Sequence, residues 1–302
     1  MNNNQVEKQK EKTAAVQNWW NTNPFTYNGS LGVGKITEVA DMDIPFFDRM
    51  EMRYKKRAGG STENADAPVF SKFIDYSSLK GKKVLDIATG TGFATVTFSQ
   101  HGADVTGIDL TEFATLATKK NLALRNLPGT ALQMDAQKLE FPDATFDFVC
   151  AHGCLMHMPN TQEAVREIYR VLKPGGKVYA WMYHRGWYYW FNILFVRGVL
   201  CGKLFTNNFS QLKLTSMYTD GASAGGNPHT KLYSYRGFKN LFEAGNFKKV
   251  RVYINYNPAE WHGWPVRTLP LGFLVPKSFQ RFLDETLRFG LGASITAEKP
   301  EV

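Results

Sequence analysis

Three carboxylates in the middle of the sequence have the type and spacing needed to hold a ligand with several hydrogen-bond donors. They are Asp86, Asp109 and Asp135, and each lies in or directly after a short apolar run. The first of them precedes a glycine-rich loop, Thr89-Gly90-Thr91-Gly92. Glycines let a backbone approach a ligand closely and make turns that side chains would block. We therefore expect a ligand site at this loop.

Each carboxylate suits a different part of such a ligand. Asp86 would attract an ammonium group and repel a pyrophosphate. Asp109, at 17 residues beyond Gly92, can bind both hydroxyls of a ribose, and Asp135 can accept a hydrogen bond from an adenine amino group. An amine, a ribose and an adenine without phosphate describe S-adenosylmethionine. The third glycine of a dinucleotide loop is replaced by Thr95, which argues against a nicotinamide cofactor.

A parallel sheet is needed to bring the three carboxylates together, because the carboxyl ends of its strands meet at one edge. The apolar patterns predict helices at 93–100, 111–126, 161–172 and 234–244, with a turn at 173–176. They predict strands at 84–88, 104–109, 130–134, 146–151, 177–182, 250–254 and 293–297. Strands that alternate with helices indicate βαβ units. We expect an α/β fold, a doubly wound and mostly parallel seven-stranded sheet with helices on both faces.

Several of these segments resemble motifs of class I S-adenosylmethionine-dependent methyltransferases. The run from Val84 to Gly92 is similar to their first motif, Ile108-Asp109-Leu110 to the second and Met134-Asp135-Ala136 to the third. The segments 146–149 and 155–159 and the turn 170–176 resemble the small-molecule branch that includes the ubiquinone and menaquinone biosynthesis enzymes. The resemblance is close over residues 80–182 and departs at Thr89, which adds bulk and a hydroxyl that we expect to be tolerated near the methionine end.

The resemblance implies a Rossmann-like fold, S-adenosyl-L-methionine as cofactor and S-adenosyl-L-homocysteine as product. The cofactor residues that we expect are Asp86, Ala88, Thr89, Gly90, Thr91, Gly92, Asp109, Leu110, Asp135, Ala136 and His152. His152 and His157 follow the fourth strand and are the candidate catalytic residues. A cofactor contact or helix cap at His152 and a packing role at His157 remain open. His184 is expected to line the pocket, and neither the histidines nor the cysteines have a metal-binding spacing.

Long extensions surround the segments that resemble the family motifs. We expect an N-terminal cap at 1–80 and a methyltransferase domain at 81–302, with lid insertions at about 183–232 and 255–289. The first dozen residues are expected to be frayed, and Glu163, Arg166, Glu167 and Arg170 to face solvent. Aromatic residues gather in the extensions: Trp19, Trp20, Phe25, Tyr27, Tyr54, Trp181, Tyr183, Trp187, Tyr188, Tyr189, Trp190, Phe191, Phe195, Tyr253, Tyr256, Trp261 and Trp264. They suit a substrate lid, a membrane surface or a subunit interface.

The charge of the chain is concentrated in its C-terminal part. Residues 1–180 hold 21 Lys and Arg against 20 Asp and Glu, whereas residues 181–302 hold 15 against 7. An acidic substrate, a nucleic acid or an anionic lipid surface could match this balance, and so could a solvated surface whose charge keeps the protein soluble. The place after the fourth strand reads Ala-His-Gly-Cys rather than the Asn/Asp-Pro-Pro-Tyr/Phe of DNA amino-methyltransferases, so no nucleic-acid partner is expected.

The remaining features predict a cytoplasmic protein. The first 17 residues have no apolar stretch typical of a secretory signal, and three cysteines are too few for a disulfide framework. The most apolar stretch, 187–201, is interrupted by Asn192, Arg197 and Gly198, which excludes a membrane span. We expect methyl transfer to an oxygen, nitrogen or carbon of a small, apolar or aromatic molecule. A non-catalytic S-adenosylmethionine-binding protein and a nicotinamide-dependent oxidoreductase are the alternatives. The oligomeric state is undetermined.

Overall fold

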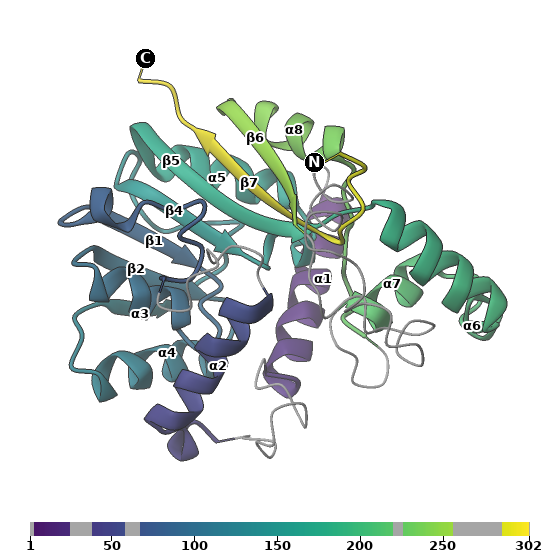
Figure 1. Ribbon diagram of the computed structural model, residues 1–302, viewed down its shortest axis with the longest axis horizontal. Helices are drawn as coiled ribbons and strands as arrows, with labels where there is room; N and C mark the ends of the chain where they lie inside the picture. The colour runs from purple at the N-terminus through teal and green to yellow at the C-terminus, as the bar shows by residue number, and fades with distance from the viewer. Residues whose placement is uncertain (1–2, 25–37, 58–66, 220–225, 256–285, 302) are drawn as a thin grey trace.

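The computed structural model describes residues 3–24, 38–57, 67–219, 226–255 and 286–301. Its centre is a seven-stranded sheet in the order β3-β2-β1-β4-β5-β7-β6 (Figure 1). The strands β1 to β5 run parallel, and β7 pairs antiparallel with both β5 and β6. The strands are β1 (Lys83–Ile87), β2 (Asp104–Asp109), β3 (Thr130–Gln133), β4 (Phe146–His152), β5 (Leu172–Tyr183), β6 (Lys248–Asn255) and β7 (Gly292–Glu298). The predicted fold class is confirmed.

Helices cover both faces of the sheet because alternate strand residues point to opposite sides. Leu85 and Ile87 of β1 pack into one core with α5 and α8, whereas Val84 packs into a second core with α3. A third apolar cluster joins α2 to Ala117 of α4. These helices are α2 (Ile44–Arg57), α3 (Phe93–Gln100), α4 (Glu112–Leu124), α5 (Thr161–Val171) and α8 (Tyr235–Glu243). Short 3₁₀ turns lie at Val39–Asp41, Tyr76–Leu79 and Leu155–His157.

The turn predicted at 173–176 is a bulge inside β5. Phe146 pairs with Leu172, and the next partner along β4, Phe148, already pairs with Lys177. Gly175, at φ 74°, supplies the left-handed backbone of this excursion. Strand β5 therefore begins at Leu172, before the bulge, whereas the sequence predicted that it begins at 177.

The N-terminal residues form a helix, α1 (Asn3–Thr22), so the expectation of a frayed start is wrong from Asn3 onward. The local sequence did not reveal this helix because 14 of its 20 residues are polar and give no periodic apolar face. Val16 is its one fully buried apolar side chain. The helix is held by polar contacts to the loops at the carboxyl edge of the sheet. In the view of Figure 1, α1 crosses the end of the sheet.

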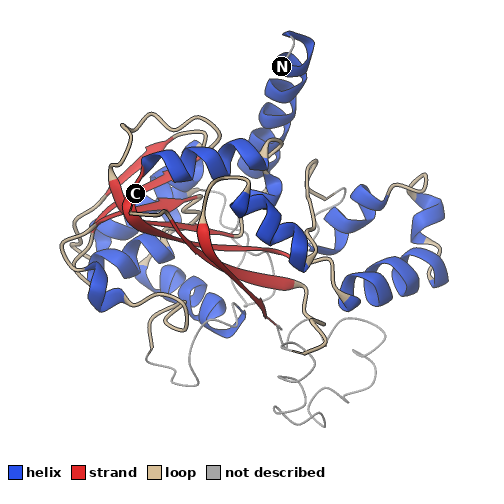
Figure 2. Ribbon diagram, turned by 90° about the horizontal axis from the view of Figure 1, so that it is seen from above, coloured by secondary structure: helices blue, strands red, loops and turns tan. Residues whose placement is uncertain are grey.

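Three helical segments follow β5, where the sequence indicated only that strand and helix alternation lapses. They are a π-helix, η4 (Tyr189–Leu200), a short α6 (Lys203–Thr206) and α7 (Gln211–Thr219). Figures 1 and 2 show these helices standing away from the sheet. Among the described helices, none is both long and apolar enough to span a membrane. Phe25, Tyr27, Tyr256, Trp261 and Trp264 lie outside the described residues, as does 256–285 of the second insertion.

Candidate active site

The order of the strands creates a topological switch point between β1 and β4. From β1 the sheet continues on one side with β2 and β3, and on the other side with β4 and β5. Ligands of open α/β sheets bind outside the carboxyl ends of the strands at such a point. The glycine loop leaves β1 there and His152 ends the neighbouring β4, since Ile87 pairs with Ala151. The sheet therefore brings the predicted cofactor loop and the first candidate histidine to one edge.

The loop after β1 turns through three left-handed residues, Ala88 at φ 61°, Gly90 at φ 56° and Gly92 at φ 80°. An alanine rarely takes this conformation, so the loop backbone is held by its surroundings. A Cβ built on Gly90 would meet no atom within 4 Å, whereas one on Gly92 would lie 3.0 Å from the Thr118 backbone. The loop is closed on its helix side and open at Gly90, where a ligand could approach.

Asp109 is bonded to this loop. Its Oδ2 accepts a hydrogen bond from the Gly90 N–H at 3.2 Å, and its Oδ1 accepts from both the N–H and the hydroxyl of Thr111 at 2.9 Å. Burial raises the pKa of Asp109 above its usual range, and these donors oppose that rise. A carboxylate has about four acceptor sites, and three are taken here, so Oδ2 keeps one for a ligand hydroxyl. Asp109 is partly exposed, which lets a ligand reach it.

Asp135 is held by Gln137, a residue that the sequence did not single out. Its Oδ1 accepts from the Gln137 N–H at 2.9 Å, and the Gln137 Nε2 lies 3.1 and 3.3 Å from the two carboxylate oxygens. The same amide donates to Thr13 of α1 at 3.2 Å. Farther along α1, Gln17 donates to the Leu110 carbonyl at 2.8 Å. Helix α1 thus contacts the loops after β2 and after β3.

Asp86 faces the interior. It is 2% exposed, its Oδ2 accepts from the Thr95 hydroxyl at 2.6 Å, and the Cys150 thiol is a second partner. Burial raises its pKa to about 7. The role of Asp86 toward a ligand ammonium stays a prediction.

Thr89 is also turned into the protein. It is buried, and its hydroxyl accepts from the Thr118 hydroxyl on α4 at 2.8 Å. A Cβ on Gly107 of β2 would lie 2.5 Å from the Thr89 Cγ2. The threonine that departs from the family motif fits because the neighbouring strand has glycine at 107.

His152 is sandwiched between aromatic rings. Its imidazole stacks on Phe70 at a centroid distance of 4.3 Å and on Trp181 at 5.3 Å. Burial lowers its pKa to about 3, so the ring is neutral near pH 7. A base with so low a pKa accepts a proton poorly, which favours a contact role over proton removal.

His157 lies farther along the same edge. Its Nδ1 is 3.1 Å from the His229 carbonyl oxygen, and its ring meets Trp20 of α1 at 5.6 Å and Tyr183 at 5.9 Å, edge to face. Trp181 contacts Tyr183 at 5.3 Å. These contacts link six rings into one continuous series, which we call the aromatic wall: Phe70, His152, Trp181, Tyr183, His157 and Trp20. His184 is buried with its Nδ1 2.9 Å from the Gly290 carbonyl, and burial lowers its pKa.

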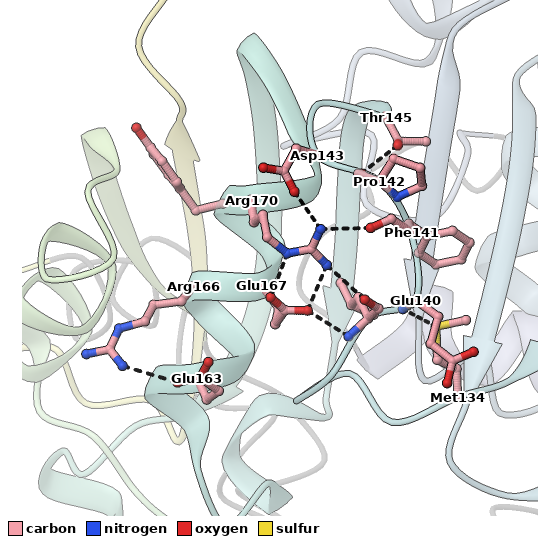
Figure 3. A network of polar contacts seen from close by, with 12 residues as sticks. Met134, Glu140, Phe141, Pro142, Asp143, Thr145, Glu163, Arg166, Glu167 and Arg170 are labelled. Atoms are coloured by element: carbon pink, nitrogen blue, oxygen red, sulfur yellow. Dashed lines mark hydrogen bonds and ion pairs between the residues drawn. The ribbon is translucent and has the colours of Figure 1, made fainter. Parts of the chain in front are cut away.

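Arg170 fixes the loop that follows Asp135 (Figure 3). Its guanidinium donates to Glu167 at 2.7 Å, to Asp143 at 2.8 Å and to the carbonyls of Phe141 and Leu139 at 2.7 and 2.8 Å. Glu167 in turn accepts from the Leu139 N–H at 2.7 Å. The expectation that Glu167 and Arg170 face solvent is wrong, because both point into this loop and are only 15% and 31% exposed. Arg166 and Glu163 do lie on the solvent side.

Known proteins match the same part of the chain. Residues 85–180 match the family model of a methyltransferase domain. The ubiquinone biosynthesis O-methyltransferase of Pseudomonas aeruginosa (strain UCBPP-PA14) is 39% identical over 151 residues, 48% of this chain and 63% of the relative. Phosphoethanolamine N-methyltransferase 2 of Caenorhabditis elegans is 33% identical over 131 residues, 43% of this chain and 29% of the relative. The chain thus spans less than two thirds of these relatives.

A solved structure extends the likeness in fold. A chain from the complex between the Haloferax volcanii Trm112 methyltransferase activator and a methyltransferase superposes with a TM-score of 0.53 at 14% identity. The match covers 87% of this chain and 96% of that chain. It supports the arrangement of the sheet and helices described above.

The site itself fits the cofactor of this family. Gly90 leaves open space at the loop, and the Thr91 hydroxyl is buried without a hydrogen-bond partner in the described part of the chain. Asp109 and Asp135 lie at the ends of adjacent strands with acceptor capacity for a ribose and an adenine amino group. No cluster of three metal-ligating side chains occurs among the described residues. The motifs, the fold and the matched segment agree that this chain carries a class I S-adenosylmethionine-dependent methyltransferase domain.

Proposed function

We propose that this protein transfers a methyl group from S-adenosylmethionine to an oxygen, nitrogen or carbon atom of a small, apolar or aromatic molecule. One observation carries the proposal. The glycine loop with Asp109 and Asp135 lies at the carboxyl edge of the sheet, and the aromatic wall passes through His152 on the neighbouring strand β4. A polar cofactor site thus lies beside a row of aromatic rings, of which Trp20, Trp181 and Tyr183 are partly exposed.

The chain's residues would orient two molecules rather than perform demanding chemistry. The cofactor supplies an already activated methyl group, so alignment provides much of the acceleration. Asp109 would accept from a ribose hydroxyl and Asp135 from the adenine amino group. The loop 88–92 and Leu110, Ala136 and His152 would contact the rest of the cofactor. Helix α1, bonded to Leu110 and Gln137, would cover the adenosine.

The partly exposed rings of the aromatic wall, which are Trp20, His152, Trp181 and Tyr183, would hold the acceptor. Flat rings offer large apolar contact with little loss of conformational freedom, which suits an aromatic or apolar molecule. With the pKa of His152 at about 3, this residue would position the acceptor. His157, between Trp20 and Tyr183, would be the candidate for receiving a proton from an acidic acceptor. The names of the matched relatives, one O- and one N-methyltransferase, support oxygen and nitrogen acceptors.

Binding measurements test the cofactor assignment. Calorimetry with S-adenosylmethionine and S-adenosylhomocysteine, with NAD and NADP as controls, should show binding of the adenosyl pair alone. Asp109→Ala should weaken that binding by about 30-fold or more, because hydrogen bonds to a charged group contribute about 1.5–3 kcal/mol each. Asp104→Ala, at the opposite and exposed end of the same strand, should leave affinity unchanged. Equal affinity of both variants would refute the placement of the site.

Turnover separates the proposal from its alternatives. Phenols, quinols, amines and lipids are incubated with S-adenosylmethionine, and S-adenosylhomocysteine release is measured. Release with one acceptor class supports methyl transfer. Adenosyl binding without release for any acceptor would favour the non-catalytic alternative, and selective NAD binding would favour the oxidoreductase.

A further inference from the structure

The helices after β5 expose a concentration of large apolar side chains. We call residues 187–213 the apolar hairpin. Nine of the sixteen exposed large apolar residues of the described chain belong to it, and the other seven are scattered. The nine are Trp187, Trp190, Phe191, Phe195, Val199, Leu200, Phe205, Phe209 and Leu212, and each is 43–65% exposed. Concentrations of this kind mark an interaction site.

These side chains are not a poorly packed core. The opposite side of η4 buries Tyr189 and Ile193 against Leu214 of α7 and Leu291, and Val196 is also buried. The hairpin therefore has an inner apolar face, which fastens it to the domain, and a second apolar face directed outward. Trp187, Phe191, Phe195 and Val199 recur every four residues, which places them on one stripe of the helix.

The charge of the hairpin has one sign. The sequence contains no Asp or Glu between Glu167 and Asp220. Arg185, Lys203 and Lys213 are exposed around the apolar stripe, and the ion pairs of the described residues include none of them. Arg185 instead lies over the ring of Trp190, 5.9 Å from its centroid. A second copy of the same surface would bring like charges together, which disfavours self-association.

We propose that the apolar hairpin is a membrane-docking surface for bilayers that contain anionic lipids. The outer stripe enters the boundary between headgroups and acyl chains, and the lysines and arginine bind lipid phosphates. Helices with apolar and aromatic side chains on one side and basic residues beside them lie in that interface. The helices of the hairpin stand away from the sheet in both views (Figures 1 and 2).

Vesicle flotation provides the first test. The full chain is mixed with vesicles of phosphatidylcholine alone or with about a quarter phosphatidylglycerol, because each basic residue near an anionic surface contributes about 1 kcal/mol. Binding to the anionic vesicles should exceed binding to the neutral ones by at least about tenfold and should weaken with salt. Absence of binding to anionic vesicles at low salt would overturn the proposal.

Paired variants assign the binding to the hairpin. The triple variant Trp190→Ser, Phe191→Ser, Phe195→Ser should lower vesicle affinity by at least about tenfold. The matched control is Leu116→Ser with Leu124→Ser, since both leucines are exposed on α4. Lys203→Glu with Lys213→Glu should also lose at least about tenfold, against the exposed pair Lys82→Glu with Lys119→Glu. Equal losses in test and control variants would contradict the proposal. Sedimentation that shows concentration-dependent dimers abolished by the triple variant would contradict it in favour of a subunit interface.

A native thiol allows membrane contact of the hairpin to be measured without a destabilising substitution. Cys201 at the hairpin tip is exposed, whereas Cys150 and Cys154 are buried. An environment-sensitive fluorophore attached to Cys201 should shift its emission to the blue when anionic vesicles are added. An unchanged spectrum in a sample that floats with the vesicles would show that another surface binds the lipid.

Discussion

The proposed cofactor side and the proposed acceptor side of the candidate active site are built differently. On the cofactor side, short segments that follow strands hold the carboxylates through hydrogen bonds, as Gly90 and Thr111 do for Asp109. On the acceptor side, side chains from four distant parts of the chain meet ring against ring, from Phe70 to Trp20. Sheet geometry thus fixes the first side, and long-range packing fixes the second. The comparison suggests that substrate choice can change while the cofactor site is kept.

Loss of the Arg170 network should have the largest effect on the cofactor side. Arg170→Met removes donors to two carboxylates and two carbonyls and leaves Glu167 half-buried, so we expect a loss of about 3 kcal/mol in the free energy of unfolding. Denaturant titration measures it. Arg166→Met, which breaks an exposed pair on the same helix, should cost less than about 0.5 kcal/mol. Similar losses in both would show that Arg170 does not hold the loop.

Gly107→Ala tests whether Thr89 is accommodated from the neighbouring strand. The added Cβ would lie 2.5 Å from the Thr89 Cγ2, so we expect about 1–3 kcal/mol of destabilisation. Adding Thr89→Ser removes that methyl and keeps the hydroxyl that Thr118 contacts. The double variant should recover part of the loss in thermal denaturation. No recovery would mean that Thr95, with its Oγ1 at 3.0 Å, is the limiting neighbour.

The pH dependence of stability should reveal the buried carboxyl of Asp86. Its pKa is about 7 in the fold against an ordinary 3.8, so between these pH values the folded chain keeps a proton that the unfolded chain has released. The contribution of Asp86 to stability therefore falls as pH rises through this window and is constant above it. Relative to the wild type, Asp86→Asn should gain about 1 kcal/mol or more between pH 4 and pH 7.5, measured by denaturant titration. The variant Asp104→Asn, at an exposed position, should show no such gain. If the stability of Asp86→Asn followed pH in parallel with that of the wild type, Asp86 would not be the titrating group.

Helix α1 contacts both sides, and loss of its hydrogen bond to the cofactor side should have the smallest effect. Gln17→Leu loses one hydrogen bond to the Leu110 carbonyl, so S-adenosylhomocysteine should dissociate about fivefold faster. Stopped-flow fluorescence of the nearby tryptophans can follow the release. The neighbouring and exposed Asn18→Leu should not change the rate. Equal dissociation rates in the wild type and in Gln17→Leu would show that α1 does not cover the cofactor.

The sequence predicted the strands that carry the candidate cofactor residues because its signals are local. Apolar runs, glycines and strand-end carboxylates appear within a few residues of one another, and all seven strands were located to within five residues at each end. Helix α1 escaped prediction because polar side chains such as Thr13 and Gln17 attach it, and polar residues give no periodic apolar signal. The inward direction of Arg170 depends on carbonyls 29 and 31 residues away. The stacking of His152 on Phe70 likewise depends on tertiary packing that no local pattern encodes.

The position of β7 bears on how this protein reaches its fold during synthesis. It is the last of the seven strands along the chain, yet it lies between β5 and β6 and pairs with both. While the ribosome is still making residues 256–291, β5 has one unpaired edge and β6 has no strand partner in the described sheet. Both edges are templates for pairing with another chain until β7 arrives. A nascent chain stalled before residue 292 should therefore depend on chaperones more than one released after residue 298.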